Sequence, residues 1–144
     1  MTFSFVADNN NSREKLETFL RGLSEADLGR TNAEGWTVSA LLVHLAFWDH
    51  RMLVLLRRWQ ANGVGDAPVD PDMINDSLRP IALALPPQTA VALCLEAAAA
   101  IDTALEQMST ELYEQIAAAP VHYRFNRSLH RNDHLGEIER LLVG

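Results

Sequence analysis

The sequence has 144 residues, of which 48% are hydrophobic and 22% are charged. This length and composition predict a single folded domain over residues 1–144 and exclude an intrinsically disordered chain. Lys and Arg number 12 against 19 Asp and Glu, which gives a formal net charge of −7. That charge argues against nucleic acid as a partner, because phosphate binding requires a concentrated basic surface.

The N-terminal residues 1–5 lack the charged region and the long apolar core of a signal peptide. No uninterrupted apolar run approaches the roughly 20 residues that a membrane-spanning helix requires. We therefore expect a cytoplasmic protein that has no membrane contact. The single cysteine, Cys94, lies among apolar residues, so we interpret it as a buried side chain rather than a nucleophile.

Apolar spacing predicts three helices in the first half of the chain. Ser12 is the expected N-cap of the first helix, which carries leucines at helical spacing. Thr37 is expected to cap a second, longer helix, which ends at the stop signal before Gly63. After a connection, Asp70 and Pro71 have the pattern of an N-cap and a first-turn proline, and they predict a shorter helix.

The second half of the chain predicts two more long helices. Residues 89–108 are rich in Ala, Leu and Glu, which favour helix, and this helix is expected to continue, frayed, through Ile116. The last helix is expected to begin near Asn126 or Ser128 and to run to about Leu142. We see no convincing strand pattern. We predict an all-α fold, a four-helix bundle with an additional short helix in the long crossover between its second and third helices.

Three of the five histidines form a candidate metal site. His130 and His134 are four residues apart, so they lie on one face of the last helix, together with Glu137 and apolar residues. His44 lies at the flank of the apolar stripe of the second helix, and it is the best-placed histidine to meet this pair. Three neutral imidazoles suit Zn²⁺ or Ni²⁺ and leave coordination positions for water or a substrate.

The same residues also have simpler interpretations. A histidine pair at this spacing can arise by chance, and buried imidazoles can be satisfied by backbone or carboxylate groups instead of a metal. His50 and His122 are interpreted as surface or capping residues. Glu137 could orient a ligand, bind the metal or act as a catalytic base. It could also form an ordinary salt bridge with Arg140 or Arg127.

Two other side chains of the second helix have predicted roles. Asp49 lies on the core side of that helix, and it is expected to pair with an arginine because burying an unpaired carboxylate is costly. Trp48 lies one turn from His44, so it could form a wall of the metal pocket. Packing in the core or at an interface is the simpler role of a tryptophan.

Two segments resemble the DinB-like (YfiT-type) superfamily of metal-binding bundle proteins. One is the Gly-Trp-Thr-Val run at residues 35–38 followed by His44, and the other is residues 130–138. In order and spacing, His44, His130 and His134 match the three metal ligands of that superfamily. The resemblance, which extends to the N-terminal bundle domain of mycothiol-dependent maleylpyruvate isomerase, implies a four-helix bundle with a metal site at one end. It also implies frequent homodimers.

Some members of this superfamily are transferases or isomerases that use a thiol such as mycothiol or bacillithiol. The resemblance therefore implies a metalloenzyme with a low-molecular-weight thiol as cosubstrate and a small electrophile as substrate. Two other functions of the same site stay open: a non-catalytic metal-binding module for stress response or dimerisation, and a hydrolase that uses water activated by the metal. A purely structural bundle would bind no metal at these histidines.

Overall fold

The structure is a computed structural model that describes residues 2–144. Helices are the only regular secondary structure in this range, apart from an isolated bridge between Thr31 and Thr37. The predicted all-α class is therefore confirmed. The helices are α1 (Ser4–Arg21), α2 (Glu25–Leu28), α3 (Val38–Asn62), α4 (Pro71–Ala84), α5 (Pro87–Glu106), α6 (Thr110–Ala118) and α7 (Ser128–Val143).

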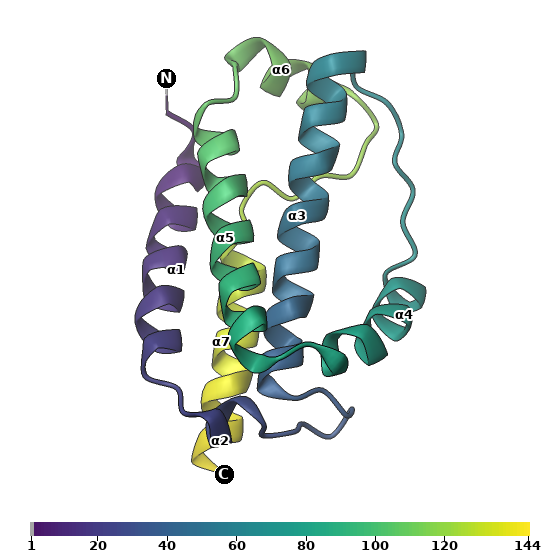
Figure 1. Cartoon of the computed structure of the whole chain (residues 1–144). Helices are drawn as coiled ribbons and strands as arrows, with labels where there is room; N and C mark the ends of the chain where they lie inside the picture. Colours follow the sequence, from purple (N-terminus) through teal and green to yellow (C-terminus); the bar gives the residue numbers. More distant parts are fainter. Residues whose placement is uncertain (1) are drawn as a thin grey trace.

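Helices α1, α3, α5 and α7 run side by side (Figure 1). Helix α3 packs against α5, α5 against α1, α1 against α7, and α7 against α3. Helix α4 lies in the crossover between α3 and α5, where it packs against α3. The last helix is therefore a neighbour of α3 in space. In the sequence, the crossover with α4, then α5 and α6, lie between Asn62 and Ser128.

Two predicted helix starts agree with the structure. Thr37 Oγ1 accepts the backbone N–H of Ala40 at 3.0 Å, which caps α3. Asp70 Oδ1 accepts the backbone N–H of Met73 at 3.1 Å, and Pro71 occupies the first turn of α4. Each cap satisfies one of the backbone donors that a helix leaves unpaired at its N-terminus.

The predicted start of the first helix is wrong. Helix α1 begins at Ser4, and Ser12 lies inside it, where its buried hydroxyl donates to the backbone oxygen of Asn9 at 2.9 Å. The additional turns are stabilised by aromatic packing, because the ring of Phe5 lies 6.2 Å from that of Tyr113. Contacts between residues so distant in sequence leave no trace in the local pattern from which the cap was inferred.

The helix that we expected to continue through Ile116 is divided in two. Helix α5 ends at Glu106, and α6 begins at Thr110. Between them, Ser109 Oγ accepts the backbone N–H of Leu112 at 3.1 Å and caps the new helix. Serine favours the N-cap over the helix interior because its hydroxyl bonds to nearby backbone groups, and here that preference outweighs the helix-forming composition of the segment.

Helices α3 and α5 are long and apolar enough to span a membrane by length and composition alone. The apolar window of α3 is 72% buried inside the protein, and that of α5 is 33% buried. Leu42, Leu45 and Leu56 of α3 belong to the fully buried side chains of the core. The apolar character of α3 is thus explained by core packing, and the two helices are weak evidence for a membrane span.

A cluster of buried charges joins α3, α5 and α7 beside the histidines. Asp49 of α3 accepts hydrogen bonds from Arg127 Nε at 2.7 Å and from Arg131 Nη2 at 3.1 Å, so its predicted pairing with an arginine is confirmed. Arg131 is 1% exposed and also donates to both carboxylate oxygens of Asp102 at 2.9 Å. Because Arg131 directly follows His130, these bonds hold the start of α7 against α3.

Candidate metal centre

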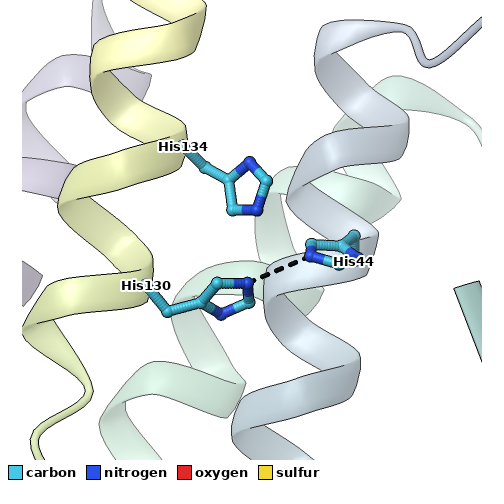
Figure 2. Close-up of side chains that lie close together, drawn as sticks. All are labelled: His44, His130 and His134. Atoms are coloured by element: carbon cyan, nitrogen blue, oxygen red, sulfur yellow. Dashed lines mark hydrogen bonds between the residues drawn. The ribbon is translucent and has the colours of Figure 1, made fainter. Parts of the chain in front are cut away.

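The three histidines predicted as metal ligands converge between α3 and α7 (Figure 2). His44 projects from α3, whereas His130 and His134 project from successive turns of α7. The centroids of the three rings form a nearly equilateral triangle with sides of 5.0, 4.7 and 4.8 Å. The ring planes are inclined to one another by 63°, 74° and 77°, so the rings surround a common point instead of stacking.

The candidate ligand atoms are close enough to share one ion. His44 Nε2 and His130 Nε2 lie 3.0 Å apart, and one nitrogen from each of the three rings lies within 4.8 Å of the others. Two imidazole nitrogens that each lie about 2.1 Å from one zinc ion are roughly 3 to 3.5 Å apart. The donor set therefore fits a divalent ion after small side-chain adjustments, and three ligands leave a coordination position open.

Burial keeps two of these rings neutral. Desolvation, with a further contribution from the neighbouring His134, lowers the pKa of His44 to about 4 and that of His130 to about 3. Neutral imidazole has the free lone pair that metal binding requires. At neutral pH His44 and His130 are therefore neutral, and the hydrogen bond between their Nε2 atoms places a hydrogen on one of these two atoms in the metal-free protein.

His134 is oriented by a carboxylate one turn further along α7. Its Nδ1 lies 2.9 Å from Glu137 Oε1, and Glu137 Oε2 accepts an Nδ2–H of Asn32 at 2.9 Å. Burial opposes ionisation of Glu137, but the hydrogen bonds from Asn32 and His134 hold its pKa below the usual value. A carboxylate at Nδ1 favours the proton on that atom and leaves the lone pair on Nε2, as is usual for a metal-binding histidine.

Asn32 is a contributor that the sequence alone does not reveal. Its Oδ1 accepts the backbone N–H groups of Glu34 and Trp36 at 3.0 and 2.9 Å. These bonds form an Asx-type turn that leaves the amide Nδ2 free to reach Glu137. The loop signal is visible in the sequence, but the approach of this loop to α7 depends on packing between segments 105 residues apart.

Two tryptophans flank His44. The Trp36 ring lies 5.6 Å and the Trp48 ring 6.4 Å from the His44 ring, both edge-on, so Trp48 forms a wall beside the histidines, as its sequence position predicts. The indole N–H of Trp48 donates to Asn75 Oδ1 on α4 at 3.0 Å. The guanidinium of Arg79, also on α4, lies over the Trp36 ring, 5.8 Å from its centroid. The crossover helix therefore covers this side of the site.

The remaining histidines and the cysteine are outside this group. His50 and His122 are exposed, in agreement with their interpretation as surface residues. Cys94 is 1% exposed, as expected for a core side chain. Burial, with a smaller contribution from Asp49, raises the pKa of its thiol to about 12.

We expect Cys94 to be unreactive toward Ellman's reagent in the folded protein at neutral pH, because the thiolate is the reacting form and its population is suppressed by the raised pKa. In concentrated guanidinium, one thiol per chain should react rapidly. The measurement is the absorbance of the released thiolate in both conditions. A rapid reaction of the folded protein would contradict the buried position of this residue.

A family model described as the mycothiol maleylpyruvate isomerase N-terminal domain matches residues 10–119. The match covers more than half of the chain and includes His44, but it ends before α7. Comparisons with curated proteins and with solved structures gave no match. The convergence of His130 and His134 on His44 is therefore an observation independent of the family match. The chain belongs to the family of the mycothiol maleylpyruvate isomerase N-terminal domain.

Proposed function

We propose that the chain binds one divalent metal ion through His44, His130 and His134. The observation that carries this proposal is the convergence of imidazoles from two helices, with the Nε2 atoms of His44 and His130 only 3.0 Å apart. Three imidazole nitrogen donors favour Zn²⁺ or Ni²⁺ over Mg²⁺ and Ca²⁺, which prefer oxygen ligands. In this proposal α1, α3, α5 and α7 are the four helices of the bundle, with α4 as the short helix of its crossover.

We further propose that the bound metal serves a thiol-dependent transferase or isomerase that acts on a small electrophile. The family description names both mycothiol and an isomerase, which supports this class of reaction. A divalent ion at this site would stabilise the thiolate of a low-molecular-weight thiol at neutral pH and so supply the nucleophile. The protein would contribute a donor set held by two helices, while Trp36 and Trp48 limit the access of water to His44.

In this proposal Glu137 is a positioning residue. Its two carboxylate oxygens are engaged by His134 and Asn32, and a carboxylate with a lowered pKa is a weak base. Of the three functional roles that the sequence leaves open for Glu137, orientation of a ligand therefore has the best support. The alternative salt bridge with Arg127 has less support, because that arginine pairs with Asp49.

We expect Glu137→Gln to weaken zinc binding by about 10- to 100-fold, the usual effect of changing the partner of a metal-binding histidine. Glutamine can still accept a hydrogen bond, but it lacks the charge that strengthens the bond to His134. Competition with a chromophoric chelator measures the dissociation constant. Glu139→Gln, an exposed change on the same helix, is the matched control. Equal affinities of the two variants would count against the positioning role.

The proposed function is tested by metal content and then by turnover. Elemental analysis of the purified protein should find about one zinc or nickel ion per chain, which a chelator removes and added metal restores. The reconstituted protein is then assayed with mycothiol or bacillithiol and a panel of small electrophiles. Metal without thiol-dependent turnover would support the non-catalytic module instead, and turnover with water alone would support the hydrolase. A protein that takes up no metal would contradict all three functions.

On the family resemblance, we also propose that the protein is a cytoplasmic homodimer. Apolar side chains on α4 and α5 are available for such an interface, since Met73 is 63%, Ile81 61% and Leu93 38% exposed. Sedimentation equilibrium should give twice the mass of the chain. A mass equal to that of one chain at all concentrations would contradict the dimer.

A further inference from the structure

One buried polar atom of the candidate site has no hydrogen-bond partner. Among the side chains of residues 2–144, His44 Nδ1 is the single buried nitrogen or oxygen atom that has no hydrogen-bond partner. Buried polar atoms are almost always paired, because leaving one unpaired in the interior is costly. The surroundings of this atom therefore bear on how His44 is held.

The location of the ring hydrogen decides whether His44 can bind a metal through the atom that faces the site. His44 Nε2 faces His130 Nε2 at 3.0 Å, and its lone pair is available to a metal only if the ring hydrogen is on Nδ1. A buried Nδ1–H then requires an acceptor. The indoles of Trp36 and Trp48 cannot serve, because an indole nitrogen only donates.

Asn75 of α4 is a polar side chain that contacts Trp48, the residue beside His44. Because the Trp48 indole only donates, its 3.0 Å hydrogen bond fixes the Asn75 amide with Oδ1 toward α3. This oxygen has a second lone pair, and the Trp48 ring that it contacts lies beside the His44 ring. A change in the Asn75 χ2 angle that is small enough to keep the Trp48 bond would turn this second lone pair toward His44, since χ2 is broadly distributed for asparagine.

The geometry links the two side chains through Trp48. The Trp48 indole donates to Asn75 Oδ1 at 3.0 Å, and the Trp48 ring lies edge-on to the His44 ring with 6.4 Å between the centroids. His44 Nδ1 has no hydrogen bond of ordinary geometry, so an acceptor beside this ring has an unpaired atom to engage.

We propose that Asn75 is a positioning residue of the metal site, whose Oδ1 accepts the Nδ1–H of His44 and thereby keeps Nε2 as the ligand atom. This inference rests on the proposed metal site and extends it to α4, a helix that supplies none of the three ligands. Asn75 would accept the Nδ1–H of His44, as Glu137 accepts that of His134. Two of the three ligands would then each have their own acceptor, one neutral and one charged.

The tautomer of His44 tests this inference in the metal-free protein. In ¹⁵N-labelled protein at neutral pH, the ring nitrogen shifts distinguish Nδ1–H from Nε2–H, and a His44→Gln variant assigns the signals. We expect wild-type His44 to carry the hydrogen on Nδ1 and Asn75→Ala to lose this preference. Asn75→Asp keeps an acceptor and should restore it. Asp76→Ala, an exposed neighbour on α4, should leave the spectrum unchanged.

Zinc affinity gives the second measurement. Asn75→Ala should bind zinc about 10-fold or more weakly than wild type, whereas Asp76→Ala should bind it equally well, with unfolding midpoints compared to exclude a general loss of structure. If wild type binds zinc but Asn75→Ala has the same tautomer and affinity, the inference is wrong and the metal site stands. If wild type binds no zinc, the proposed function fails, and the metal-free tautomers of wild type and Asn75→Ala still decide whether Asn75 orients His44.

Discussion

Replacing His130 with alanine is expected to reduce the zinc content of the protein from about one ion per chain to nearly none. His130 Nε2 lies 3.0 Å from His44 Nε2, so its removal leaves the donors of His44 and His134 on different helices without the ring between them. Loss of a direct ligand should exceed the about 10- to 100-fold weakening that follows changes to outer partners. The fold should persist, because the half-buried ring is neutral and its removal leaves no unpaired charge.

His50→Ala is the matched control for this experiment, because His50 is a histidine of α3 whose side chain is exposed. It should retain the zinc content of wild type, whereas His44→Ala should lose it as His130→Ala does. Thermal unfolding gives a second readout, since zinc at about 100 times its dissociation constant stabilises a protein by about 2.7 kcal/mol. Only wild type and His50→Ala should show that stabilisation. Zinc retained at wild-type affinity in His130→Ala would place the ion elsewhere.

The ligands on α7 were predictable because they belong to a single helix. The spacing of four residues places His130 and His134 on one face whatever the topology, and the apolar residues of that face indicate that it points inward. His44 was harder to assign, because the long crossover before α5 leaves the position of α3 relative to α7 undetermined by spacing. Its place at the flank of the apolar stripe made His44 the best candidate, the family resemblance strengthened that choice, and the geometry of the three rings supports it.

The partners of the ligands were not predictable from local patterns. Asn32 and Asn75 lie in a loop and on the crossover helix, and each reaches the site through contacts between segments far apart in the sequence. Arg131 was not predictable for another reason. Arginine is among the residues least often fully buried, so the sequence gives no ground for placing Arg131 in the core. The requirement that a buried carboxylate be paired predicted that Asp49 needs an arginine, but it could not say which one.

Replacing Asp49 with alanine should destabilise the fold by about 3–5 kcal/mol, the usual cost of removing one partner of a buried ion pair. Arg127 and Arg131 would lose the carboxylate that accepts their hydrogen bonds at 2.7 and 3.1 Å, and both side chains are at most 6% exposed. Urea unfolding of the metal-free protein measures the change. Asp76→Ala removes an exposed ion pair with Arg79, and it should cost only about 0–1 kcal/mol.

Equal midpoints of the Asp49 and Asp76 variants would mean that the buried cluster contributes no stability. A quadruple replacement of Asp49, Asp102, Arg127 and Arg131 by leucine or methionine separates stability from positioning, because apolar substitution of a whole buried ion cluster is often neutral or stabilising. We expect this variant to unfold at a higher urea concentration than Asp49→Ala. Its zinc affinity should nevertheless stay below that of wild type, because Arg131 adjoins His130 and its bonds to α3 and α5 hold the first turn of α7 in place. Wild-type affinity in a stable quadruple variant would show that helix packing alone brings the three imidazoles together.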